Sequence, residues 1–249
     1  MRDSSGSQRG SGRSDSQRHG VEDPYAPRVG AFPSRQDPTR NTVPGVSGET
    51  LKTGTTTVGL TTADGVVLAA DMRASLGGRF VANKDMQKVE QVHPTGAITI
   101  AGSVGGAQSF IRTLRAEVDL YEARRGEDLS IEALQTLAGN IARGGPFFAV
   151  TLLLGGVDEE GSQLASVYPD GSVSRDDYKV TGSGMQLAYG VLEREYEEDL
   201  TNEEAVGVAA RAIDSATERD TASGDGITVA EITDEGVSIT RQDDLADLV

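Results

Sequence analysis

Small and apolar residues dominate two neighbouring segments of the chain, residues 55–62 and residues 66–74. The turn-forming run Ala63-Asp64-Gly65 separates them. Apolar runs on both sides of a short polar turn are typical of a β-hairpin. The pattern therefore predicts two paired strands at the start of the folded part of the chain.

Further along, the spacing of apolar residues changes to that of helices. Phe110, Leu114, Val118 and Tyr121 form one stripe and predict a helix over residues 103–124, and Ser130 begins a second helix that runs to about residue 142. Two more helices are predicted over 184–198 and 202–217. A strand at 80–81 is expected to pair with one at 97–102, and a strand at 147–154 with one at 163–168. A further strand should follow the turn at 168–172. Residues 227–233 and 237–240 are expected to form a closing hairpin.

The order of these elements is strands, two helices, strands, two helices, strands. Paired helices between antiparallel strand blocks indicate two sheets packed face to face with helices outside each, rather than a parallel βαβ sheet. We therefore predict an α+β fold.

Residues 1–54 form a leader that differs in composition from the rest. This leader is rich in Ser, Gly, Arg, Asp and Pro and has no apolar run long enough for a signal peptide. We expect it to be mostly disordered, and residues 55–249 to form one folded domain. No segment approaches the roughly 20 apolar residues of a membrane helix.

Charge and composition exclude several classes of function. The formal net charge is −16, and the excess of acid lies after residue 54. Such a balance argues against nucleic-acid and membrane partners, which favour a basic face. The acidic excess, together with a count of only four lysines, also suggests adaptation to high salt. An ordinary acidic protein is the alternative.

Cysteine is absent, and only two histidines occur. The chain therefore has no disulfide or thiolate nucleophile, which fits a cytoplasmic location, and little material for a histidine triad or a metal site. We expect no metal and no cofactor. We interpret His93, which precedes Pro94, as a turn residue.

The sequence Gly54-Thr55-Thr56-Thr57-Val58-Gly59 stands where the leader ends. If the bond between Gly54 and Thr55 is cut, Thr55 gains a free α-amine next to its own hydroxyl, so one residue holds nucleophile and base. The pKa of an α-amine, roughly 7.7–8.0, suits this role. Without a Cβ, Gly54 tolerates the strained backbone that self-cleavage requires. The alternative is an ordinary strand that begins with threonines.

Four later segments place polar or glycine residues where apolar strands end. Asp71 follows a buried apolar strand and needs a partner, for which Lys88 is the natural candidate. A cation near Thr55 would lower the pKa of its amine. A purely structural ion pair is the alternative.

Gly102 ends the second of these segments. Its backbone N–H can approach and stabilise an oxyanion, and the alternative is a glycine that serves only for packing. The other two segments are turns that present hydroxyls and a carboxylate, from Ser183, Asp220 and Ser223.

Taken together, these segments resemble the β subunit of the archaeal, and in particular haloarchaeal, proteasome, a threonine peptidase of the N-terminal nucleophile hydrolase class. The resemblance covers residues 55–249. It rests on an ordered set of motifs: Gly-Thr-Thr-Thr-Val-Gly at 54–59, Asp71 with Arg73, Lys88, Thr-Ile-Ala-Gly at 99–102, Thr-Gly-Ser-Gly at 181–184 and Arg-Asp-Thr-Ala-Ser-Gly at 219–224.

The resemblance implies a four-layer αββα sandwich and a role for each motif. Thr55 would be nucleophile and proton shuttle, freed by autocatalytic removal of the leader. Asp71 and Lys88 would be its charged support, and Gly102 the oxyanion donor. The N-terminus would be oriented by Ser183, Asp220 and Ser223. The positions that match the pocket for the substrate side chain are Ala74, Met86, Glu90, Ile100, Val104 and Gln108, whose mostly apolar character suggests cleavage after hydrophobic residues, although Glu90 could admit a basic one.

The same resemblance implies partners. These are seven-membered β rings of identical subunits, outer rings of α subunits, an unfolding ATPase and unfolded polypeptides as substrates. Two alternatives stay open. One is the bacterial two-ring relative with the same nucleophile and six-fold symmetry. The other is a catalytically silent ring subunit, which would keep its leader.

Overall fold

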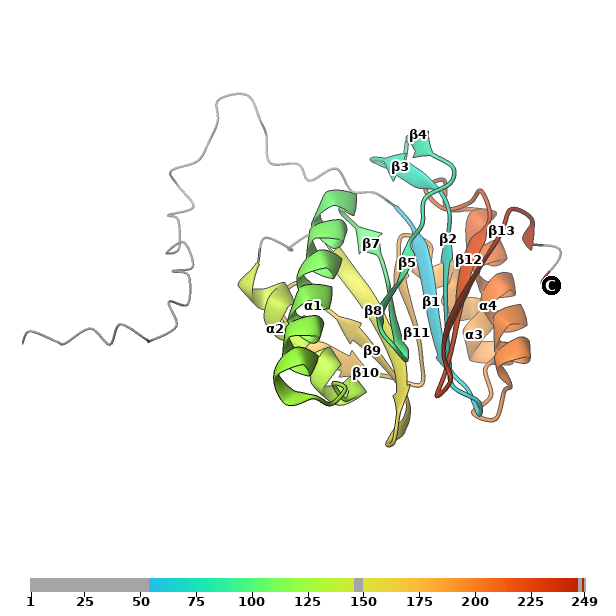
Figure 1. The fold of residues 1–249 in the computed structure, drawn as a ribbon. Coiled ribbons are helices and arrows are strands. Elements are labelled where there is room, and N and C mark those ends of the chain that lie inside the picture. Colours follow the sequence, from blue (N-terminus) through green and yellow to red (C-terminus); the bar gives the residue numbers. More distant parts are fainter. Residues whose placement is uncertain (1–53, 146–149, 246–247, 249) are drawn as a thin grey trace, which may run out of the picture. The chain divides into compact units, whose positions relative to one another are not determined.

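Two antiparallel sheets lie face to face, and a pair of helices covers the outer face of each (Figure 1). The computed structural model describes residues 54–145, 150–245 and 248. Of the leader predicted over residues 1–54, residues 1–53 lie outside the described residues. The first three residues of the strand predicted over 147–154 also lie outside them.

The first sheet contains the predicted opening and closing hairpins. Its strand order is β11 (Tyr178–Gly182), β1 (Thr56–Thr61), β2 (Val66–Asp71), β12 (Ile227–Thr233) and β13 (Gly236–Gln242). The second sheet has the order β10 (Val173–Arg175), β9 (Gly161–Val167), β8 (Val150–Asp158), β6 (Gly96–Thr99) and β5 (Val89–His93), and β7 (Ala101–Gly102) also pairs with β8.

The helices occur where the apolar periodicity predicted them. α1 (Val104–Arg125) and α2 (Ile131–Gly144) pack on the second sheet, and α3 (Met185–Glu195) and α4 (Asn202–Thr217) pack on the first. Side-chain caps define three of the N-termini. Ser103 and Ser130 accept backbone N–H groups of α1 and α2, and Thr201 forms a capping box with Glu204 in α4.

Three apolar layers hold these elements together. Along β2, Val67 and Ala69 face α3 and α4, whereas Val66, Leu68 and Ala70 face the second sheet. This period-two alternation lets one strand contribute to two layers at once. The third layer lies between the second sheet and its helices. The predicted αββα sandwich is confirmed. No helix in the described part of the chain is long and apolar enough to cross a membrane.

The strands around residue 80 differ from the prediction. The strand at Phe80–Asn83 (β4) pairs with Ala74–Leu76 (β3), not with residues 97–102, and β6 pairs instead with β5, which the pattern did not reveal. β2 also ends at Asp71, earlier than predicted, because the backbone N–H of Arg73 turns back to the Asp71 carboxylate. Two glycines with positive φ, Gly77 and Gly78, then form the tight turn of the β3–β4 hairpin.

His93 is the last residue of β5 rather than a turn residue. Its side chain is buried, and Nδ1 accepts the backbone N–H of Thr95 over 3.2 Å. Burial lowers the pKa of His93 below its usual 6.5, although Glu122, Asp128 and Asp158 act in the opposite direction. The folded chain therefore resists protonation of this imidazole.

From this burial follows a pH dependence of stability. As the pH falls below about 6.5, the unfolded chain binds a proton at His93 that the folded chain does not bind until its lower pKa is reached. The free energy of unfolding should therefore fall more steeply with acidification in the wild type than in His93→Gln, by at most about 1.4 kcal/mol per pH unit. Urea unfolding of both proteins between pH 7 and pH 5, at constant salt, measures the difference. Equal slopes would contradict it.

Candidate active site

Strand ends meet at one edge of the first sheet. β1 is antiparallel to both of its neighbours, so its first residue, Thr56, lies opposite Gly182 at the end of β11, and Thr57 lies opposite Ala70 near the end of β2. β12 begins at the same edge, with Ile227 opposite Asp71. The topology thus gathers the segments that carry Thr55, Asp71, Ser183, Asp220 and Ser223.

The second sheet adds two residues from the opposite side. Lys88 directly precedes β5, and its carbonyl accepts the backbone N–H of Ile100 over 2.8 Å, which places it beside the end of β6. Gly102 ends β7, has a φ of 113°, and lines the same small cavity as Thr55 and Lys88. All seven predicted catalytic residues therefore belong to segments that the fold brings to one place.

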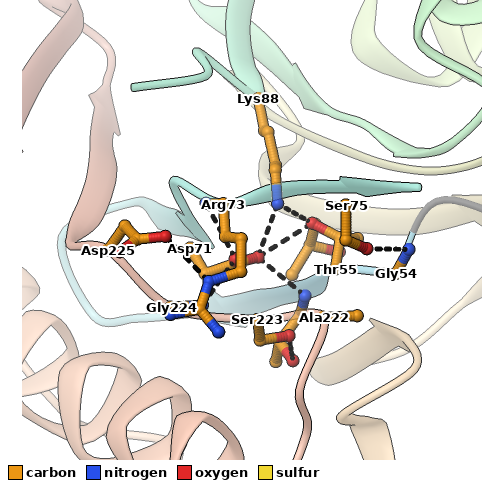
Figure 2. Close-up of polar contacts among 12 residues, drawn as sticks. Gly54, Thr55, Asp71, Arg73, Ser75, Lys88, Ala222, Ser223, Gly224 and Asp225 are labelled. Carbon is orange, nitrogen blue, oxygen red and sulfur yellow. Dashed lines mark hydrogen bonds and ion pairs between the residues drawn. The ribbon is translucent and has the colours of Figure 1, made fainter. Parts of the chain in front are cut away.

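The carboxylate of Asp71 is the centre of this arrangement (Figure 2). The side chain is fully buried, and five donors satisfy it. Oδ1 accepts the hydroxyl of Thr55 (2.8 Å), the backbone N–H of Thr56 (2.9 Å) and the ammonium of Lys88 (2.7 Å), and Oδ2 accepts the backbone N–H groups of Arg73 (3.1 Å) and Gly224 (2.9 Å). A buried carboxylate with this many donors keeps a fixed position.

Thr55 Oγ1 lies between the two charged groups. It donates to Asp71 and accepts a hydrogen bond from Lys88 Nζ. Thr55 is 3% exposed and Lys88 5%, so bulk water does not screen these contacts. Burial lowers the pKa of the Lys88 ammonium, while the attraction of Asp71 opposes this shift. The predicted ion pair of Asp71 and Lys88 is confirmed, and the hydroxyl of Thr55 is hydrogen-bonded to both of its members.

A second hydrogen-bond chain holds the backbone of Thr55. Its N–H donates to Ser183 Oγ over 3.1 Å, and Ser183 Oγ donates in turn to Asp220 Oδ2 over 2.5 Å. The same oxygen of Asp220 accepts the hydroxyl of Ser223 over 2.7 Å, and that hydroxyl also contacts Thr56 Oγ1 at 2.8 Å. These side chains thus fix the direction of the nitrogen of Thr55.

Two glycines, Gly54 before Thr55 and Gly182 on the neighbouring strand, pack so closely that a side chain has no room at either position. A Cβ on Gly54 would lie 2.0 Å from the Cβ of Ala222, and a Cβ on Gly182, whose φ is +99°, would lie 2.0 Å from the carbonyl oxygen of Thr55. The N–H of Gly54 donates to Ser75 Oγ over 3.3 Å (Figure 2). The Gly54–Thr55 bond is therefore held tightly from both ends.

The six predicted pocket residues divide between two cavities. Ala74, Met86, Ile100 and Val104 line the small cavity next to Thr55. Glu90 and Gln108 line a larger neighbouring cavity, together with Gln87, Ile111, Arg112 and Arg115, and Met86 and Ile100 also line this second cavity. The two cavities thus share part of their walls.

Several contacts of the site had no signal in the sequence. Ser75 precedes an apolar residue in a short strand, and nothing in its surroundings marks it as a partner of Gly54. The N–H donors of Thr56 and Gly224 belong to the backbone, which any residue supplies. The ion pair of Arg73 with Asp225 (2.7 Å) joins positions far apart in the sequence. Within residues 54–145 and 150–245, no cluster of His, Asp and Glu could hold a metal ion.

Comparison with known proteins adds an independent line of observation. A family model described as "Proteasome subunit" matches residues 51–232. The chain is 65% identical to "Proteasome subunit beta 1" of Haloterrigena turkmenica over 226 residues, 91% of each protein, and equally similar to "Proteasome subunit beta" of Natrialba magadii. Identity to "Proteasome subunit beta 1" of Haloarcula marismortui is 63% over 223 residues, 89% of each protein.

Removal of the Lys88 cation should leave the buried carboxylate of Asp71 without its counter-charge. We expect Lys88→Met to lower the free energy of unfolding by about 3–5 kcal/mol. Urea unfolding of the wild type and the variant measures this loss. In a double-mutant cycle, Asp71→Asn combined with Lys88→Met should cost less than the sum of the single losses. Additive losses would show that the two side chains do not interact.

Proposed function

Because this chain belongs to the proteasome subunit family, as a β subunit of the core particle, we propose that it is a threonine-type endopeptidase whose nucleophile is Thr55. The resemblance to haloarchaeal β subunits is confirmed. One observation carries the assignment of the nucleophile. Thr55 Oγ1 lies in a buried site between the carboxylate of Asp71 and the ammonium of Lys88.

The chemistry begins once the bond before Thr55 is cut. The amide nitrogen, held by Ser183, then becomes an amine that takes the proton of Oγ1 as the oxygen attacks a substrate carbonyl. The backbone N–H of Gly102 stabilises the oxyanion. When the intermediate collapses, the amine returns the proton to the leaving amine and an ester with Thr55 remains. Water, activated by the same amine, hydrolyses this ester and regenerates the hydroxyl.

The same hydroxyl performs the first cut. Oγ1 attacks the carbonyl of Gly54, the acyl group moves from nitrogen to oxygen, and water hydrolyses the resulting ester. The products are the carboxylate of Gly54 and the free amine of Thr55. Two features support this step: the bond is held by Ser75 and Ser183 on either side, and Gly54 has no space for a side chain.

Proteasome β subunits assemble into rings with α subunits. For this chain we propose seven-membered β rings between α rings in the cytoplasm, fed with unfolded polypeptides by an ATPase, and identity above 60% to archaeal β subunits supports this over the bacterial two-ring form. The complete network around Thr55 argues against a silent subunit.

The nucleophile assignment predicts the outcome of two substitutions. Thr55→Ala removes the hydroxyl, so the protein should keep residues 1–54 and lose at least about 10³-fold in peptide hydrolysis. Thr55→Ser keeps both the hydroxyl and the future amine, and should be processed and active. Intact-mass measurement and a fluorogenic peptide assay test both. Thr61→Ala, at the other end of β1, is the matched control and should behave as wild type. An unprocessed but active Thr55→Ala protein would refute the assignment.

The α-amine should also determine the pH profile. Only the neutral amine accepts the proton of Oγ1, and Lys88 acts on the pKa of that amine in the opposite direction to the carboxylates of Asp71 and Asp220. The value of kcat/KM should therefore rise with pH through one apparent pKa in the range of an α-amine, about 7.7. Initial rates of peptide hydrolysis between pH 5.5 and about pH 9 measure it. The idea fails if kcat/KM does not change over this range.

A further inference from the structure

The two oxygens of the Asp71 carboxylate have different partners. Oδ1 contacts the hydroxyl of Thr55 and the ammonium of Lys88. Oδ2 accepts the backbone N–H groups of Arg73 and Gly224. Because a carboxylate is planar, the direction of one oxygen determines the direction of the other. The two backbone donors therefore help to fix the position at which Oδ1 meets the hydroxyl of Thr55.

One ion pair links the two segments that supply these donors (Figure 2). Arg73 Nε donates to Asp225 Oδ2 over 2.7 Å. Arg73 itself supplies the first N–H, and Asp225 directly follows Gly224, which supplies the second. The guanidinium also donates to the carbonyl of Thr221 over 3.1 Å, so it holds the loop at two points. The side chains of Arg73 and Asp225 thus connect both donors of Oδ2.

The loop backbone is unusual at the same place. Asp225 has a φ of +64°, and in the part of the chain that the structure describes it is the one residue other than glycine with a positive φ. Most side chains avoid this left-handed region, and aspartate and asparagine adopt it more readily than the others. Gly224 and Gly226, on either side, have φ of 146° and 106°. An aspartate thus stands where the backbone favours glycine, and its contact with Arg73 offsets that cost.

The ion pair lies partly inside the molecule. The side chains of Arg73 and Asp225 are 24% and 16% exposed, so solvent screens their attraction only in part. The hydrogen bond from Arg73 lowers the pKa of the Asp225 carboxyl, and the same bond raises the pKa of the guanidinium. Both groups therefore stay charged at neutral pH. Lys84 Nζ lies 3.6 Å from the other oxygen of Asp225, but its side chain is 74% exposed and adds little.

We propose that Asp225 is a positioning residue for the peptidase reaction: through Arg73 it holds the two N–H donors of Asp71 Oδ2, and thereby the oxygen that receives the hydroxyl of Thr55. This inference rests on the proposed function and adds a residue that acts through Arg73 rather than on the reacting atoms. Loss of its carboxylate releases the loop from the guanidinium, so both donors are held less firmly. Asp71 can then turn, and Thr55 Oγ1 spends less time in the geometry of attack.

The test uses assembled particles and separates kcat from KM. Asp225→Gly removes the carboxylate and accommodates the positive φ, so kcat for a fluorogenic peptide should fall about tenfold at unchanged KM. Cleavage before Thr55, followed by intact mass during assembly, should slow by a similar factor, because it needs no bound substrate. Asp225→Asn adopts the same φ and still accepts the N–H of Arg73, so kcat should stay within about threefold of wild type. Glu195→Ala, which breaks a 2.6 Å ion pair with Arg211, is the control and should leave kcat unchanged.

Arg73→Gln breaks the same pair from its other side and should give a similar loss. Adding Asp225→Gly to Arg73→Gln should cause no further loss. If Asp225→Gly particles fail to assemble, Arg73→Gln is judged by the same criteria. Unchanged kcat, a change in KM alone, additive losses in the double variant or an equal loss in Glu195→Ala would refute the role of Asp225.

These outcomes separate the inference from the proposed function. The peptidase function still stands after such a refutation, provided that wild type cuts the peptide and Thr55→Ala does not. If wild type neither loses its leader nor cuts the peptide, both ideas are wrong.

Discussion

A fully buried carboxylate organises this molecule, because its charge must be satisfied where water is absent. Asp71 ends β2, and its five donors come from the start of β1, from the chain after β2, from the loop before β12 and from Lys88 on the other sheet. Each donor ties another segment to the same point. The demand for hydrogen bonds thus positions Thr55, whose hydroxyl is one of the five.

The two sheets contribute different halves of the proposed site. The first sheet supplies the hydroxyl and the carboxylate, and the second supplies the cation and the glycine N–H. The apolar layer between the sheets, which includes Leu68 and Leu153, therefore sets the distance between Thr55 and Lys88. Catalytic geometry of this kind depends on close packing in the centre of the sandwich, since packed interiors do not adjust gradually.

Local patterns were sufficient to predict the layers but not all of the strands. The stripe that begins at Phe110 and the opening hairpin have clear periods, so their elements were predicted correctly. β5 was missed because Val89-Glu90-Gln91-Val92-His93 mixes polar and apolar residues without strict alternation, and Phe80 is exposed on a hairpin outside the two main sheets. Motifs with chemical side chains revealed the candidate site. The contact of Glu90 with Arg115 depends on the packing of α1 against β5, which no local pattern encodes.

The intact bond before Thr55 has an electrostatic consequence. In the uncut chain, the nitrogen of Thr55 is a neutral amide, and around it stand one formal positive charge, on Lys88, and two negative charges, on Asp71 and Asp220. Two more cations, on Arg73 and Lys84, contact Asp225 at 2.7 and 3.6 Å. The proposed scission would form one ammonium, on Thr55, and one carboxylate, on Gly54, and departure of the leader would take that carboxylate away. Asp220, which Ser183 links to this nitrogen, would then be a counter-ion in place before the charge that the proposed cleavage creates.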